Sequence, residues 1–156
     1  MYPDSKLNLN YETEDSVYFF TVRYEPLSSW SPHRVELWGE KFMTVEHGYH
    51  FRKFRETAPK VASQMLEEPS PWAAMRLDRR HKELRREDWH SVKVEIMREL
   101  MGAKLEQNDD VRECLKATGT KIIIENSPWD RFWGCGSDGK GENMLGRLWV
   151  ELRAKL

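Results

Sequence analysis

The sequence lacks the features that mark several large classes of protein. No run of about 18 apolar residues occurs, and the first fifteen residues, MYPDSKLNLNYETED, are polar and acidic. These two observations argue against a membrane span and a secretory signal peptide. Only two cysteines are present, too few for a disulfide framework or a thiolate metal site. We therefore expect a cytoplasmic protein without a membrane partner.

The chain also lacks a charge imbalance and an internal repeat. Its 156 residues carry a formal net charge of −1, so binding to nucleic acid would have to depend on a local basic patch. This length suits one globular domain that buries about 70 % of its unfolded surface. No low-complexity linker divides the chain.

Hydrophobic periodicity predicts an α+β fold that is mainly helical, with a few short strands packed on a helical bundle. Residues 1–15 are expected to be a loose arm, and residues 16–156 a single domain. Strands are expected at 16–25, in a hairpin at 34–42 that turns at Gly39-Glu40, and at 121–125. Helices are expected after Thr44, at 60–68, after Ser70-Pro71, from Asp88, from Asn108 to Gly119, and through Leu145, Leu148 and Leu152.

Tryptophan is abundant, with seven residues. Large aromatic rings usually belong to the core, although an excess also suits stacking on a flat ligand. Trp30 and Trp133 fall in expected loops, as does Trp129, which favours contact with a ligand. Trp89 and Trp149 fall on or beside helical stripes, which favours the core.

The stretch TVEHGYHFRKF, residues 44–54, places unusual groups in one column. On a helix Glu46, His50 and Lys53 share one face, with Tyr49 at its margin. An exposed face stabilised by i, i+4 pairs would explain the pattern. A metal site at His47 and His50 is a second alternative, but the order E-H-x-x-H differs from known zinc helices and no third ligand is evident.

The stretch NSPWDRFWGCGSDGKGEN, residues 126–143, is rich in glycine and leads into a helix. Glycines allow close approach of the backbone, and a helix start favours anions. Residues 134–139 satisfy GxGxxG, but they do not stand directly between a strand and a helix, so a dinucleotide-binding fold is disfavoured. The interleaved Asp130, Trp133, Asp138 and Asn143 distinguish this loop from a plain turn.

Basic residues are concentrated between Arg76 and Arg86. A solvated helix face explains them, and contact with the phosphates of a nucleotide or nucleic acid is the functional alternative.

Several motifs occur together in a familiar order: S-S-W-S-P-H, T-x-E-H-x-x-x-x-x-K-F, D-W-x-x-V-K, and E-x-S-P-x-D-x-x-W-G-x-G-x-D-G-x-G-x-N-x-L-G-R-L. This set resembles the NADAR (NAD- and ADP-ribose-associated), or YbiA-like, family over residues 18–153. Some positions depart from the family pattern. The usual Ser-Asn-Phe is Ser28-Ser29-Trp30 in this chain, which keeps an aromatic residue. Asp78 replaces a glycine, and His50 stands where many members carry a small or uncharged residue.

The resemblance implies an N-glycosidase that acts on an amine-linked ribose without a cofactor. Members are reported to cleave phosphoribosylamino-pyrimidine intermediates of riboflavin synthesis. Others remove ADP-ribose from guanine in DNA or RNA, in some cases as antitoxins to DarT-type toxins. We expect the ADP-ribosyl-guanine activity here because of the basic segment. The riboflavin activity and a non-catalytic ADP-ribose or NAD reader remain alternatives.

Two routes would suit such a substrate. A lysine amine can displace the base nitrogen through a Schiff base, or a carboxylate can activate water directly. We hypothesise that Lys53 is the nucleophile, Glu46 the acid/base and Asp130 an orienting or second acid/base group. An exposed lysine is almost wholly charged at pH 7, so the first route requires a dry pocket. Substrate contacts are expected from Ser29, Trp30, His47, Tyr49, His50, Trp89, Trp133, Gly134, Gly136, Asp138, Gly139 and Asn143.

Overall fold

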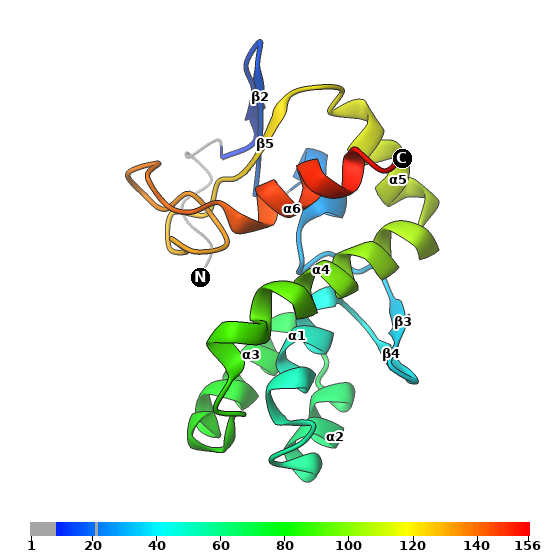
Figure 1. The fold of residues 1–156 in the computed structure, drawn as a ribbon, viewed down its shortest axis with the longest axis vertical. Helices are drawn as coiled ribbons and strands as arrows, with labels where there is room; N and C mark the ends of the chain where they lie inside the picture. Colours follow the sequence, from blue (N-terminus) through cyan, green and yellow to red (C-terminus); the bar gives the residue numbers. More distant parts are fainter. Residues whose placement is uncertain (1–8, 21) are drawn as a thin grey trace. The chain divides into compact units, whose positions relative to one another are not determined.

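The structure is a computed structural model that describes residues 9–20 and 22–156. The chain divides into two compact units (Figure 1). Residues 29–109 form the first, and the described part of residues 1–28 forms the second together with residues 110–156. The helices of the described residues include none with the length and apolar character needed to cross a membrane.

The first unit is built around helix α1 (Val45–Phe54), which packs against three other helices. These are α2 (Pro59–Glu67), α3 (Pro71–Arg80) and α4 (Trp89–Gln107). A short 3₁₀ helix, η2 (Lys82–Leu84), connects α3 towards α4. Because neighbours surround α1, nine of its ten residues are buried, Glu46 and Lys53 among them, and only Arg52 is half-buried.

The start of α1 agrees with the sequence prediction. The side chain of Thr44 accepts a hydrogen bond from the backbone N–H of His47, as an N-cap does. Ser70 caps α3 in the same way and Pro71 occupies the first turn. Both predicted caps are therefore confirmed.

The predicted hairpin forms, but its turn lies one residue earlier than expected. Strands β3 (Val35–Leu37) and β4 (Glu40–Phe42) are antiparallel, and Leu37 pairs with Glu40. The turn residues are Trp38 and Gly39, both with positive φ. Two such residues make the type of turn whose twist matches a hairpin, which is why Glu40 already belongs to the strand.

The second unit has a small sheet with helix α6 (Met144–Arg153) packed on it. Strand β2 (Ser16–Phe19) lies between β1 (Tyr11–Glu12), which is antiparallel to it, and β5 (Ile122–Glu125), which is parallel (Figure 1). Helix α5 (Asp109–Ala117) leads into β5. Trp149 of α6 is buried and its indole N–H donates to the carbonyl of Leu27, so its predicted core position is confirmed.

Two predictions for the N-terminal segment need correction. The strand expected at 16–25 ends at Phe19, because β5 offers only four residues for pairing. Residues Val22–Leu27 form a 3₁₀ helix, η1, that includes Pro26, and residue 21 lies outside the described residues. Within the expected loose arm, Tyr11–Glu12 forms β1; residues 1–8 lie outside the described residues.

Helix α6 can approach β5 closely only because Gly146 has no side chain. A Cβ at Gly146 would lie 2.0 Å from the carbonyl oxygen of Ile123. This oxygen belongs to the backbone of β5, so it cannot easily move away. We expect Gly146→Ala to lower the free energy of unfolding by about 3 kcal/mol or more. Gly102→Ala is the matched control, since nothing lies within 4 Å of its Cβ position in α4 and alanine favours a helix. Equal stability of the two variants in urea unfolding would refute this interpretation.

Candidate functional site

A cluster of buried charged side chains lies where α1 faces α3. Glu46, His50 and Lys53 of α1 are only 9 %, 3 % and 6 % exposed, and Asp78 of α3 is 2 % exposed. Arg85, which follows η2, is half-buried beside Asp78. We call these five residues the α1–α3 cluster. The column predicted from the sequence is thus inside the unit and not on a solvated face.

Asp78 is the centre of the α1–α3 cluster. Its Oδ2 accepts a hydrogen bond from Lys53 Nζ at 2.7 Å and lies 3.0 Å from His50 Nδ1. Arg85 donates from Nε to Oδ1 at 2.6 Å and from Nη2 to Oδ2 at 2.9 Å, a bidentate pair. Burial by itself would raise the pKa of Asp78, but the surrounding His50, Lys53 and Arg85 hold that pKa well below its usual range.

Glu46 is held from two sides. The hydroxyl of Ser29 donates to Glu46 Oε2 at 3.0 Å, and the backbone carbonyl of Ser29 accepts the Glu46 N–H. On the other side His50 Nε2 lies 3.0 Å from Glu46 Oε1. Burial acts to raise the pKa of Glu46, and the contacts with His50, Lys53 and Ser29 outweigh it, so that the pKa is lowered. Ser29 therefore orients the carboxylate.

Burial shifts the protonation equilibrium of Lys53 towards the neutral amine. Its Nζ is 4.8 Å from the ring centre of Tyr49 and 5.3 Å from that of Trp89, and both rings are buried. Burial lowers the pKa of Lys53, and this effect exceeds the opposing influence of Asp78. The shielding from water that a Schiff base requires is therefore present around this amine.

His47 has a different environment from His50. Its Nε2 lies 2.9 Å from the carbonyl of Glu68 and its Nδ1 lies 2.8 Å from Thr44 Oγ1. A carbonyl only accepts, so Nε2 carries the proton and Nδ1 accepts from the threonine hydroxyl. Both ring nitrogens are thus used within the unit, and the expected substrate contact of His47 stays a prediction. Across residues 9–20 and 22–156 no group of three or more potential ligands is arranged to hold a metal ion.

Two tryptophans form a partly exposed aromatic pair in the same unit. The rings of Trp30 and Trp72 are tilted, with centres 6.0 Å apart, and Trp72 is 46 % exposed. Such a pair leaves an aromatic surface that a base could stack on. Trp89, in contrast, is buried against Tyr49, with ring centres 4.8 Å apart.

The glycine-rich loop belongs to the second unit, and several of its expected site residues hold the loop itself together. Asp130 Oδ1 accepts from the backbone N–H groups of Phe132 and Trp133. The amide of Asn143 accepts from Glu125 N–H and donates to the carbonyl of Ile123. Asn143 therefore joins β5 to the start of α6, and its expected role as a substrate contact stays a prediction.

The conformation and packing of the loop also explain why glycine occupies several of its positions. Gly136 and Gly139 both have φ of +70°, which favours glycine. Gly134 is buried, and a Cβ there would lie 2.9 Å from the carbonyl oxygen of Asp130. Asp138 is exposed and accepts from Arg131 and from the backbone of Lys140. These contacts would exist without any ligand.

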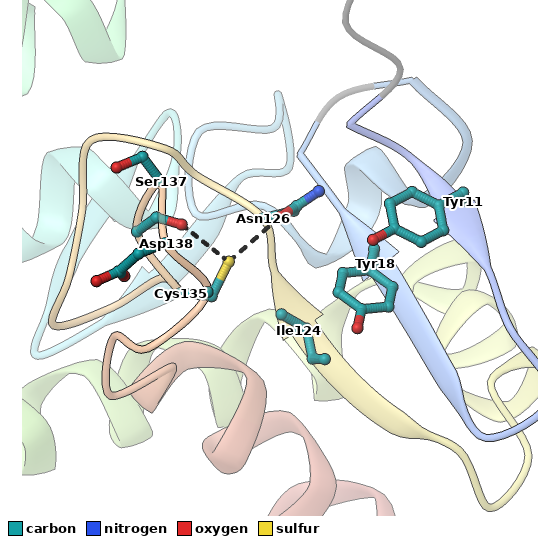
Figure 2. Close-up of a pocket in the computed structure, with 9 residues that line it drawn as sticks. Tyr11, Tyr18, Ile124, Asn126, Cys135, Ser137 and Asp138 are labelled. Carbon is teal, nitrogen blue, oxygen red and sulfur yellow. Dashed lines mark hydrogen bonds between the residues drawn. The ribbon is translucent and has the colours of Figure 1, made fainter.

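A cavity of about 340 Å³ nevertheless lies beside the loop, within the second unit. Figure 2 shows the stacked rings of Tyr11 and Tyr18 on one side and Cys135 with Ser137 and Asp138 on the other. Gly136 and Gly139 also line the cavity, so three of the expected loop residues face an open space. The thiol of Cys135 donates to Asn126, and burial raises its pKa, which argues against a reactive thiolate.

The sequence interpretation missed Asp78 and Arg85 as members of the site. The basic segment is not one helix, since α3 ends at Arg80. Arg85 pairs with Asp78, and Arg86 pairs with Asp88. The sequence pattern could have indicated Asp78. Ala74, Leu77 and Asp78 share one face of α3, so an acidic residue lies on an otherwise apolar stripe.

Comparison with known proteins gives a consistent result. The NADAR domain matches residues 12–156. The N-glycosidase Npun_R5314 of Nostoc punctiforme is 35 % identical over 144 residues, which are 90 % of this chain and 92 % of that protein. The riboflavin biosynthesis protein VVA0006 of Vibrio vulnificus is 33 % identical over 149 residues, which are 92 % of this chain but only 39 % of that protein.

A solved structure agrees with the fold. The NMR structure of Escherichia coli YbiA, a protein named as an N-glycosidase, superposes with a TM-score of 0.83. The sequences are 30 % identical, and the match covers 95 % of this chain and 88 % of the other. The α+β, mainly helical fold class predicted from the sequence is confirmed. The chain therefore belongs to the NADAR domain family and is a hydrolase that acts on N-glycosyl compounds, an N-glycosidase.

Proposed function

We propose that this N-glycosidase removes ADP-ribose from the exocyclic amine of guanine in nucleic acid, with Lys53 as nucleophile and Glu46 as acid/base. The observation that carries the proposal is the burial of an amine and a carboxylate on one helix, beside the rings of Tyr49 and Trp89. An amine and a carboxylate can act together on the carbon that joins a sugar to an amine nitrogen, one as nucleophile and the other as acid/base.

The chemistry begins with the substrate's own nitrogen. Its lone pair expels the ring oxygen from the anomeric carbon, which gives an open-chain imine. The neutral amine of Lys53 adds to this carbon, and the base nitrogen takes a proton and leaves as a free amine. The resulting Schiff base between the sugar and Lys53 is hydrolysed by water, which releases the sugar and restores the amine.

Glu46 would supply the proton transfers of this sequence. In its protonated form it gives the departing nitrogen a proton, and as a carboxylate it activates the water that hydrolyses the Schiff base. Ser29 fixes its orientation. Asp130 and the glycine-rich loop lie in the second unit. A role of Asp130 as an orienting or second acid/base group is part of the proposal.

The exposed face of α3 supports a polyanionic substrate. Trp72, Arg76 and Arg80 recur at intervals of four residues, so they share one side of the helix, and all three are exposed. Arg76, Arg79, Arg80 and Lys82 form no ion pair with any described residue, so their charges are available to phosphates. A DarT-type ADP-ribosyltransferase is the kind of partner that would produce such a substrate in DNA or RNA.

The second candidate substrate is a phosphoribosylamino-pyrimidine intermediate of riboflavin synthesis. The name of the Vibrio vulnificus relative supports it, although this chain spans only 39 % of that protein. A free nucleotide carries fewer phosphates than an oligonucleotide, so this activity would gain less from the basic face of α3.

The two substrates can be compared directly by chromatography of the released sugar. We expect faster cleavage of an oligonucleotide that carries ADP-ribosyl-guanine, with a KM that rises steeply with salt. The double variant Arg76→Gln, Arg80→Gln is expected to raise that KM about tenfold, because two phosphate contacts are lost. Lys41→Gln on the exposed hairpin removes the same kind of charge and serves as the control. Cleavage of the pyrimidine nucleotide alone would favour the second candidate.

A further inference from the structure

Four ionisable side chains form an unbroken series of contacts between the two proposed catalytic groups. Lys53 Nζ donates to Asp78 Oδ2 at 2.7 Å, and the same oxygen lies 3.0 Å from His50 Nδ1. The other ring nitrogen, His50 Nε2, lies 3.0 Å from Glu46 Oε1. All four side chains are buried, so water does not interrupt the series.

The charges of the α1–α3 cluster restrict which of these groups carry protons. The cluster contains two carboxylates, Glu46 and Asp78, and the guanidinium of Arg85, which pairs with Asp78 and stays protonated. One further positive charge therefore makes the cluster neutral, and a second would be buried without a partner charge. His50 and Lys53 are the two groups that can carry that single charge. Helix α4 contributes the uncharged ring of Trp89 to this environment, and His47 lies beyond Glu46 on α1.

The position of His50 matches that role. Both of its ring nitrogens face carboxylate oxygens at 3.0 Å, and neither has another hydrogen-bond partner among the described residues. A neutral ring always points one lone pair at an oxygen, whereas the doubly protonated ring does not. The contacts therefore favour transfer of the charge to His50 when Lys53 is neutral.

We propose that His50 and Asp78 are positioning residues that form a proton relay from Lys53 to Glu46. The inference rests on the proposed roles of these two groups. One proton leaves the Lys53 ammonium across Asp78 Oδ2 to His50 Nδ1, and His50 Nε2 gives a proton to Glu46. The result is a neutral amine and a protonated carboxyl, the pair of forms that the first chemical step requires. The departing base nitrogen then takes the proton from Glu46.

The relay gives a reason for two departures from the family pattern. His50 and Asp78 were singled out separately in the sequence, and the structure brings them into contact. Neither is placed to touch the reacting carbon in the proposed chemistry. Each acts through the group beside it, His50 on Glu46 and Asp78 on Lys53.

The relay can be tested without any substrate, by ¹⁵N NMR of the histidine ring nitrogens in the full chain. We expect Lys53→Met to leave His50 doubly protonated up to a higher pH than in the wild type, because the shared charge then has only one carrier. Asp78→Asn is expected to reduce the doubly protonated fraction. Ring spectra of His50 that are the same in all three proteins would overturn the relay, whatever the substrate proves to be.

A kinetic test adds a readout that a purely structural role would not change. We expect His50→Gln to lower kcat by about 10²-fold with little change in KM. The rising limb of the pH profile of kcat should also move to higher pH, because Lys53 loses its proton acceptor. The matched control is His90→Gln, the same substitution at an exposed histidine of α4 that lies outside the α1–α3 cluster. A pH limb that does not move in His50→Gln would contradict the relay. Absence of turnover in the wild type would instead contradict the proposed substrate, and the NMR result would still stand.

Discussion

Lys53→Met is expected to abolish covalent capture of the sugar and to lower kcat by about 10³-fold or more, because no other amine replaces the nucleophile. Borohydride reduces a Schiff base to a stable bond. The wild type incubated with substrate and borohydride should therefore gain the mass of the sugar, and peptide mapping should place that mass on Lys53.

The first unit provides a matched control for this prediction. Lys104 is also a buried lysine, 1 % exposed, and its amine donates to Ser31 Oγ. Lys104→Met should lose stability but keep both turnover and capture, because its amine is outside the α1–α3 cluster. Near-normal turnover in Lys53→Met would exclude the Schiff base and leave Glu46, with direct attack by water, as the centre of the reaction.

Asp78→Ala is expected to lower the free energy of unfolding by about 3–5 kcal/mol, since it leaves the charges of Lys53 and Arg85 without their common partner. For a chain of this size the melting temperature should fall by about 6–20 °C. Calorimetry or urea unfolding of the full chain would measure both quantities.

Asp88→Ala is the control for the buried carboxylate. Asp88 also accepts two hydrogen bonds from one arginine, Arg86, but its side chain is 53 % exposed. Solvent screens such a pair, so the loss of stability should be much smaller than in Asp78→Ala. Equal losses of stability in Asp78→Ala and Asp88→Ala would show that burial does not strengthen the contacts of Asp78.

The pH dependence of this contribution follows from the direction of the pKa shift. The pKa of Asp78 in the folded state is below the ordinary value of 3.8, so the unfolded chain binds more protons as the pH falls. The stability that Asp78 provides should therefore be complete above about pH 4 and decrease as the pH falls further. The difference in the free energy of unfolding between wild type and Asp78→Ala should become smaller over the same pH range.

Features set by neighbouring residues could be predicted from the sequence. Thr44 and Ser70 cap their helices through hydrogen bonds that span three residues, and a helix places Glu46, His50 and Lys53 in one column whatever surrounds it. Residue types and spacing are enough to predict such local contacts. The family resemblance then supplied the reaction class.

Features set by packing could not be predicted in the same way. Whether the column on α1 is buried depends on three other helices, and the position of Asp78 opposite it depends on how α3 packs. The length of β2 depends likewise on how many residues of β5 pair with it, and this number cannot be predicted from the residues of β2 alone. The structural roles of His47 and Asn143 rest on partners about 20 residues away in the sequence.

In the proposed mechanism Lys53 and Glu46 converge on the carbon that joins sugar to nitrogen. A crystal structure of the variant Glu46→Gln with an ADP-ribosylated guanine nucleotide would show whether they do. We expect the anomeric carbon within about 3.5 Å of Lys53 Nζ, with residue 46 at its side. A nucleotide bound with this carbon beyond reach of Lys53, for example one held whole in the cavity beside Cys135, would contradict it.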